Sequence, residues 1–137
     1  MTLIRVYLAG AIAGCTDEAA NNWRQDIIKL YGGLGSPFKF LNPMDRDYRN
    51  KHIGPEEEKL IVGLDKIDIA SSYAVMFNYT EPTVGTSMEG VYSHMWGKLG
   101  VLICKTDKGL SPWWKYHVNK IVYSDHEAIK YIVEQHG

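Results

Sequence analysis

A glutamate behind a glycine- and hydroxyl-rich turn has the residue type and the setting for chemistry. The turn contains Gly85, Thr86 and Ser87, and Glu89 follows it. A strongly apolar run at 73–77 comes before the turn, and such a strand-to-helix turn is where an open α/β sheet forms its ligand crevice. We expect Glu89 in the first turn of the helix, where the dipole and free N–H groups lower the pKa of a carboxylate. An ionised Glu89 could act as a nucleophile or an electrostatic stabiliser; a plain partner of the helix dipole is the alternative.

Two aspartates and a tyrosine are the next candidates. Asp65 and Asp68 are three residues apart in a helical pattern, so they share a face. Acids near a helix C-terminus oppose the dipole, which suggests a second role for the pair, although Asp68 alone is interpreted as solvated. Tyr7 stands in an apolar strand pattern and needs a partner for its hydroxyl. A carboxylate across the crevice would provide one, and an ordinary core tyrosine is the alternative.

Histidines and cysteines form no recognisable metal motif. None of the five histidines has a partner at ligand spacing, and Cys15 and Cys104 form neither a CxxC motif nor another metal spacing. We therefore expect no metal and no cofactor. Unpaired thiols are typical of a cytoplasmic protein, which is the location that we expect.

The length and charge of the chain limit its class. A chain of 137 residues is expected to form one domain, residues 1–137. The net charge of −1 gives no electrostatic reason to expect nucleic acid as a partner. Neither a signal peptide nor an apolar run long enough to span a bilayer is apparent, so we expect no membrane association.

Hydrophobic periodicity and glycine or proline punctuation predict the elements that must position these residues. Strands are predicted at 3–9, 38–41, 74–79, 101–104 and 121–123, and helices at 18–31, 55–71, 86–98 and 126–134. This alternation predicts a parallel sheet with helices on both faces, so the loops after the first and third strands flank one crevice. Residues 44–54 carry much charge without periodicity, which predicts a loop that could cover a site.

A dense aromatic segment follows the fourth predicted strand. Trp113, Trp114 and Tyr116 are expected in a loop. Exposed aromatic side chains are typical of an interface or a ligand-binding face, and packing beneath the loop is the alternative. We expect the chain to self-associate through residues 113–116 and the helix at 86–98.

Several short motifs, taken together, resemble the nucleoside 2-deoxyribosyltransferase family. They are residues 7–12, 23–24, 41–44 and 85–90, with Asp65 followed by Ile69, and the turn at 97–98. The resemblance covers residues 6–104 and the last helix. It implies a flavodoxin-like fold, a three-layer α/β sandwich with a five-stranded, mainly parallel sheet. It also implies a homo-oligomer, a dimer or higher, with shared active sites.

A reaction is implied by the same resemblance. Glu89 matches the family's nucleophile, which attacks the anomeric carbon of a 2′-deoxynucleoside, forms a covalent deoxyribosyl-enzyme and releases the base. A free nucleobase then takes the sugar, a reaction of nucleotide salvage. Tyr7 matches the residue that orients the nucleophile, and Asp65 matches the acid that handles the proton of the base.

The resemblance further implies which residues bind the substrate. Arg46 and Asp47 fall near the residues that recognise the base, and Trp113 and Trp114 fall where a neighbouring subunit closes the pocket. The whole implied set is Gly10, Ala11, Arg46, Asp47, Thr83, Gly85, Ser87, Trp113 and Trp114.

Thr83 departs from the pattern of the transferases, which commonly carry an aspartate there to hold the sugar 5′-hydroxyl. A hydroxyl residue resembles the related 2′-deoxynucleoside 5′-monophosphate N-glycosidases, because a carboxylate would repel a phosphate and a threonine can donate to it. Against this, Ala11 and Ala13 lack the polar groups that those hydrolases place in the first loop. Transfer and hydrolysis both stay open. A non-catalytic nucleotide-binding module on the same fold is the alternative of another class.

Overall fold

Helices and strands alternate along the part of the chain that the computed structural model describes, residues 3–106 and 109–137. In chain order they are β1 (Ile4–Gly10), α1 (Asp17–Tyr31), β2 (Phe38–Leu41), the 3-10 turn η1 (Pro43–Arg46), α2 (Pro55–Ser71), β3 (Ala74–Tyr79), α3 (Val84–Met95), β4 (Leu99–Cys104), α4 (Pro112–His117), β5 (Lys120–Val122) and α5 (Asp125–His136). None of the helices in this described part is long and apolar enough to cross a membrane.

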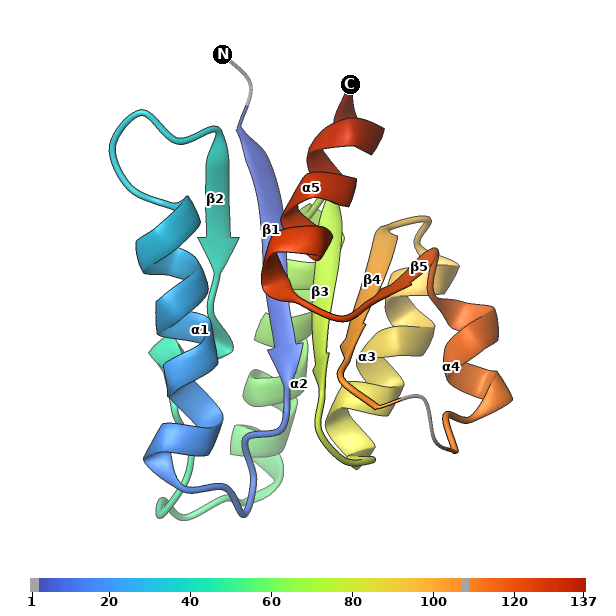
Figure 1. Cartoon of the computed structure of the whole chain (residues 1–137). Coiled ribbons are helices and arrows are strands. Elements are labelled where there is room, and N and C mark those ends of the chain that lie inside the picture. Colours follow the sequence, from blue (N-terminus) through green and yellow to red (C-terminus); the bar gives the residue numbers. More distant parts are fainter. Residues whose placement is uncertain (1–2, 107–108) are drawn as a thin grey trace.

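The five strands form one sheet in the order β2-β1-β3-β4-β5, and each neighbouring pair is parallel. The strand order reverses between β1 and β3, where Tyr7 pairs with Val75 and Gly10 with Asn78. In an open α/β sheet, the crevice at the carboxyl ends of two such strands is the usual ligand site. The loops that follow β1 and β3 lie side by side at the lower edge of the sheet in Figure 1.

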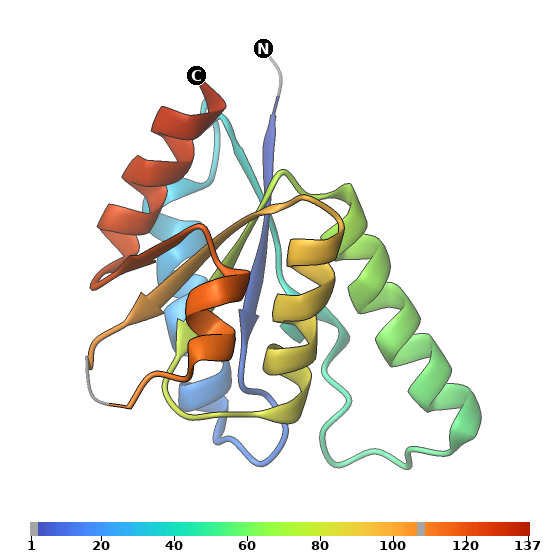
Figure 2. The ribbon, with the colours of Figure 1, turned by 90° about the vertical axis from the view of Figure 1, so that its right-hand side faces the viewer.

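Helices cover both faces of the sheet (Figure 2). α1 and α5 pack on one face through a buried apolar cluster: Ile4, Val6, Leu8, Ile27, Ala74, Met76, Val101, Ile103, Val122, Ala128, Ile129 and Ile132. α2, α3 and α4 lie on the other face, where the second cluster is Tyr7, Ala9, Ile69, Val75, Phe77, Leu102, Cys104 and Trp114. These features confirm the predicted three-layer α/β arrangement.

The geometry of β1 determines on which face of the sheet the side chain of Tyr7 lies. Successive side chains of a strand point to opposite faces. Val6 and Leu8 therefore pack towards α1 and α5, whereas Tyr7 and Ala9 pack towards α2 and α3. The side chain of Tyr7 thus reaches the same side of the sheet as Asp65 and Glu89.

Helix boundaries correct two predictions. α3 begins at Val84 rather than Thr86, so Glu89 lies in its second turn and not in its first. The aromatic segment expected in a loop is the short helix α4, in which Pro112 occupies the first turn. Ser111 caps this helix by accepting a hydrogen bond of 3.1 Å from the Trp113 N–H.

Candidate active site

The hydroxyl of Tyr7 and the carboxylate of Glu89 meet on the α2–α3 side of the sheet. Tyr7 Oη donates a hydrogen bond of 2.5 Å to Glu89 Oε2. Tyr7 is 1% exposed, so its hydroxyl depends on this acceptor. This bond confirms the prediction that a carboxylate across the crevice is the partner of the Tyr7 hydroxyl. It joins the middle of β1 to α3.

The pKa of Glu89 is raised, whereas the sequence analysis predicts a lowered pKa. Burial, together with the nearby carboxylate of Asp65, raises the pKa of Glu89 to about 7. The hydrogen bond from Tyr7 and the charge of Arg24 act in the opposite direction but do not offset burial. The expected depressed pKa is therefore wrong. Its two supposed causes, a first-turn position and free N–H groups, are absent one turn further along the helix.

Asp65 stands opposite this pair on α2. Its Oδ1 accepts a hydrogen bond of 2.9 Å from Arg46 Nη2, and the same nitrogen lies 2.7 Å from Asp68 Oδ2. Burial raises the pKa of Asp65, although Arg46 acts against this rise. Asp68, interpreted from the sequence as solvated, is instead paired. The carboxylate of Asp65 raises the pKa of Glu89, and both carboxylates raise the pKa of Tyr7, so the three groups lie close enough for their charges to interact.

A pocket of about 440 Å³ opens in front of these groups. It is bounded by β1 and its following loop, by α2 and by the start of α3. Its lining residues are Tyr7, Gly10, Ala11, Ile12, Ala13, Tyr48, Val62, Asp65, Lys66, Ile69, Thr83, Val84, Gly85, Thr86, Met88, Glu89 and Tyr92. The switch-point crevice therefore holds all three residues predicted to do chemistry.

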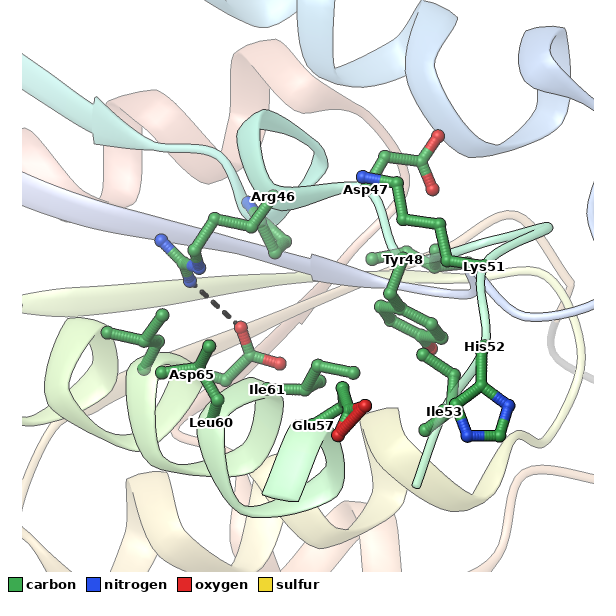
Figure 3. Close-up of a pocket in the computed structure, with 13 residues that line it drawn as sticks. Arg46, Asp47, Tyr48, Lys51, His52, Ile53, Glu57, Leu60, Ile61 and Asp65 are labelled. Carbon is green, nitrogen blue, oxygen red and sulfur yellow. Dashed lines mark hydrogen bonds and ion pairs between the residues drawn. The ribbon is translucent and has the colours of Figure 1, made fainter. Parts of the chain in front are cut away.

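A second pocket, of about 300 Å³, adjoins the first and is drawn in Figure 3. Ile12, Tyr48 and Asp65 line both pockets, so they form the shared wall. Arg46 and Asp47 line only the second pocket, whose floor is the apolar face of α2. Two adjoining pockets that share a carboxyl group can hold two parts of one ligand, with the bond between those parts beside Asp65.

A buried arginine supports the loop that closes the first pocket. Arg24, on α1, is 0% exposed and donates to the carbonyls of Leu8 and Gly10, at 3.2 and 3.0 Å, and to that of Ala20. Gly10 has to be glycine, since a Cβ there would lie 2.7 Å from the Trp23 ring. Burial lowers the pKa of Arg24 to about 10, which leaves it a cation beneath the site at neutral pH.

Thr83 has an unusual hydroxyl. Its Oγ1 is buried and has no hydrogen-bond partner among residues 3–106 and 109–137, although the residue precedes α3 in the usual capping position. Thr83 lines the first pocket together with Gly85. A polar atom in this state gains a hydrogen bond when a suitable ligand group arrives.

Three residues of the predicted binding set lie elsewhere. Ser87, Trp113 and Trp114 line a separate pocket of about 340 Å³ between α3 and α4. Trp114 is buried there against Phe77, with ring centroids 5.2 Å apart, which agrees with packing beneath the segment. Trp113 is 73% exposed. Within a single protomer, none of the three reaches the pocket that contains Glu89.

Sequence reasoning missed several lining residues. Tyr48 stands in a segment without periodicity, so no pattern marked it. Lys66 and Tyr92 come together across α2 and α3, with the Lys66 ammonium 4.4 Å from the centre of the Tyr92 ring. The only available signal for Lys66 was its position next to Asp65. In residues 3–106 and 109–137, no group of three or more His, Cys, Asp or Glu side chains could hold a metal ion.

The fold and this site together define a flavodoxin-like α/β protein in which Tyr7, Asp65 and Glu89 line one pocket at the switch point. Among solved structures, a 2-deoxyribosyltransferase from the psychrotolerant bacterium Bacillus psychrosaccharolyticus superimposes with a TM-score of 0.71 at 14% identity, over 92% of this chain and 90% of that chain. A conserved protein from Enterococcus faecalis V583 superimposes with a TM-score of 0.75, also at 14% identity, over 98% and 99%. No protein-family model and no curated protein matches the sequence. The expected flavodoxin-like fold is confirmed by these likenesses.

Proposed function

We propose that this chain is an enzyme of the nucleoside 2-deoxyribosyltransferase family. It would cleave the N-glycosidic bond of a 2′-deoxynucleoside, or of its 5′-monophosphate, and transfer the deoxyribose to another base. The observation that carries the proposal is the bond between Tyr7 and Glu89 in a pocket that Asp65 also lines. The similarity between the fold of this chain and that of the 2-deoxyribosyltransferase from Bacillus psychrosaccharolyticus supports the proposal.

The proposed first step is nucleophilic substitution at the anomeric carbon. A carboxylate oxygen of Glu89 bonds to C1′, and the bond between C1′ and the base nitrogen breaks with its electron pair on the base. Asp65 gives its proton to the departing base. Tyr7 keeps its hydrogen bond to the other oxygen of Glu89, which holds the carboxylate in one orientation.

The second step reverses these roles. A nitrogen of an incoming base bonds to C1′, the ester bond to Glu89 breaks, and its electron pair returns to the carboxylate. The proton of the incoming base goes to Asp65. Two displacements at one carbon give retention of configuration.

The two adjoining pockets suit the two halves of the substrate. The first pocket, with Glu89 and Tyr7, would take the deoxyribose, and the second would take the base against the apolar face of α2. Asp65 and Tyr48 line both, so the glycosidic bond would lie beside them. Arg46 and Asp47 would then face the base, as the resemblance implies.

Hydrolysis of a 5′-monophosphate is the second candidate, and Thr83 favours it. Its buried, unpartnered hydroxyl could donate to a phosphate, whereas an aspartate would repel one. Backbone N–H groups of residues 10–14 could assist, since loops of this kind bind anions. In this reaction water would replace the second base.

Self-association and a cytoplasmic location complete the proposal. Trp113 and Tyr116 on α4 are more than two thirds exposed, as are Val84 and Met95 on α3. Exposed apolar side chains on two neighbouring helices are typical of an interface between subunits. A second copy would allow Trp113 to approach a site that it does not reach within its own protomer.

The test is chromatography of the protein incubated with thymidine and with dTMP, each with and without free adenine. A new adenine deoxynucleoside or deoxynucleotide would show transfer, and free thymine without an exchanged product would show hydrolysis. Glu89→Gln should abolish both, while the exposed control Tyr123→Phe should keep them. Intact-protein mass spectrometry should detect a deoxyribosyl adduct on the wild type alone. Binding without turnover would reject the enzyme and support a nucleotide-binding module.

A further inference from the structure

One guanidinium nitrogen bridges two carboxylates at the edge of the proposed site. Arg46 Nη2 lies 2.9 Å from Asp65 Oδ1 and 2.7 Å from Asp68 Oδ2. Figure 3 shows Arg46 reaching from η1 to Asp65 on α2. The side chains of the three residues are 20–32% exposed, so solvent screens the cluster only in part.

Asp65 and Asp68 are not equivalent members of this cluster. Asp65 lines both pockets, and only one of its oxygens is bonded to Arg46. Asp68 lines neither pocket. It is therefore placed to act on Asp65 rather than on a ligand.

We infer that Arg46 and Asp68 are positioning residues that act through Asp65: Arg46 stabilises the carboxylate form of Asp65, and Asp68 stabilises its acid form. This inference rests on the proposed function, in which Asp65 must both give and take a proton. It gives Arg46 a second role beside base recognition, because Nη2 of its guanidinium bridges the two acids.

The cluster keeps its geometry in both protonation states of Asp65. When Asp65 is ionised, the guanidinium is shared between two carboxylates. When Asp65 is protonated, Asp68 still holds Arg46 in place with a charge-assisted bond of 2.7 Å. Arg46 is then already beside the carboxylate that forms when the proton goes to the base, so little reorganisation is needed.

Other charges also act on Asp65, and they come from every element around it. The titratable and charged neighbours are Tyr7 on β1, Arg24 on α1, Arg46 on η1, Tyr48 in the following loop, Lys66 and Asp68 on α2, and Glu89 on α3. Burial raises the pKa of Asp65, Arg46 lowers it, and Asp68 raises it. Arg46 and Asp68 are thus opposite influences that can be removed separately.

The test compares the pH dependence of kcat/KM in Asp68→Asn and Arg46→Gln. Asparagine keeps an oxygen that can accept from Arg46 but removes the charge, so the limb of the profile that reports Asp65 should move to lower pH. In Arg46→Gln the same limb should move to higher pH. The limb is identified as the one that disappears in Asp65→Asn. Glu58→Gln, an exposed acid on the same helix, is the matched control and should leave the profile unchanged.

Opposite shifts distinguish this role from a structural one, since lost packing would lower kcat in both variants without moving the limb. Shifts in the same direction, or no shift in either variant, would overturn the inference. Titration of the Asp65 carboxyl carbon by NMR gives the same comparison without turnover. An inactive wild-type protein would therefore reject the proposed function, while the titration would still decide the electrostatic roles of Arg46 and Asp68.

Discussion

The hydroxyl of Tyr7 donates a 2.5 Å hydrogen bond to Glu89 Oε2 and so joins the middle of the sheet to the second turn of α3. Burial disfavours the ionised form of Glu89, and this bond favours it. The balance raises the pKa of Glu89 to about 7, which lets the group change its charge near neutral pH. Groups with proton affinities shifted in this way are typical of catalytic centres.

Loss of the Tyr7 hydroxyl should weaken the proposed reaction without disrupting the core. Tyr7→Phe keeps the buried ring but removes the donor, so the pKa of Glu89 should rise further. A hydrogen bond to a charged group contributes about 1.5–3 kcal/mol, which corresponds to roughly a 10- to 100-fold fall in kcat/KM at pH 7. Steady-state kinetics on the best deoxynucleoside substrate measures the fall. Tyr123→Phe, at an exposed position, is the control, and equal activity in both variants would contradict the role of Tyr7.

Ionisation of Glu89 should cost the protein stability. Between pH 4.5 and 7 the unfolded chain has released this proton while the folded protein keeps it, so stability falls as the pH rises through that window. Glu89→Gln removes the ionisation and keeps the side-chain shape. We expect the variant to match the wild type at pH 4.5 and to exceed it by up to about 3 kcal/mol at pH 8.

Urea denaturation at several pH values measures this difference. The exposed Glu81→Gln is the control and should show no such dependence on pH. A difference that stays constant from pH 4.5 to 8 would show that the pKa of Glu89 is not raised in the folded protein.

Two glycines in helices should respond in opposite ways to alanine. At Gly90 a Cβ would lie 2.9 Å from the Trp114 ring, which is held against Phe77 and Tyr79. We expect Gly90→Ala to lower the free energy of unfolding by about 1–3 kcal/mol through overpacking. At Gly63 no atom of the described residues, apart from the adjoining backbone of α2 itself, lies within 4 Å of the added Cβ, so Gly63→Ala should raise it by about 0.5–1 kcal/mol. Thermal denaturation of both variants tests the contact, and stabilisation by Gly90→Ala would show that the Trp114 ring can move.

Much of the fold was predictable because its signals are local. Apolar runs, helical spacing and glycine punctuation predicted the strands and long helices, and the βα alternation predicted a parallel sheet. The meeting of Tyr7, Asp65 and Glu89 also followed, since the resemblance and the topology both bring these residues to one crevice. The residues of 44–54 that line the second pocket were less predictable. That segment has no periodicity, and ion pairs to α1 and α2 hold it in place.

Electrostatic properties were not predictable in the same way. The start of α3 lies two residues before the predicted one, and this small change moves Glu89 out of the first turn. Its pKa then depends on burial by β1 and α2, which no local pattern reports. Arg46 is a similar case, since its partners Asp65 and Asp68 are 19 and 22 residues away.

The exposed apolar side chains of α3 and α4 predict that the protein self-associates. Trp113, at 73% exposure, and Met95, at 68%, are large apolar side chains in the protomer. Sedimentation velocity at micromolar concentration should therefore detect a species of at least twice 15.5 kDa. The double variant Trp113→Ser, Met95→Ser should shift the protein towards the monomer, because burial of such side chains supplies most of the affinity of an interface. Leu34→Ser, at an exposed apolar position between α1 and β2, is the control and should not change the mass.

If active sites are shared between subunits, the monomeric variant should also lose activity while it keeps its thermal stability. A wild-type protein that sediments only as a monomer would contradict both expectations.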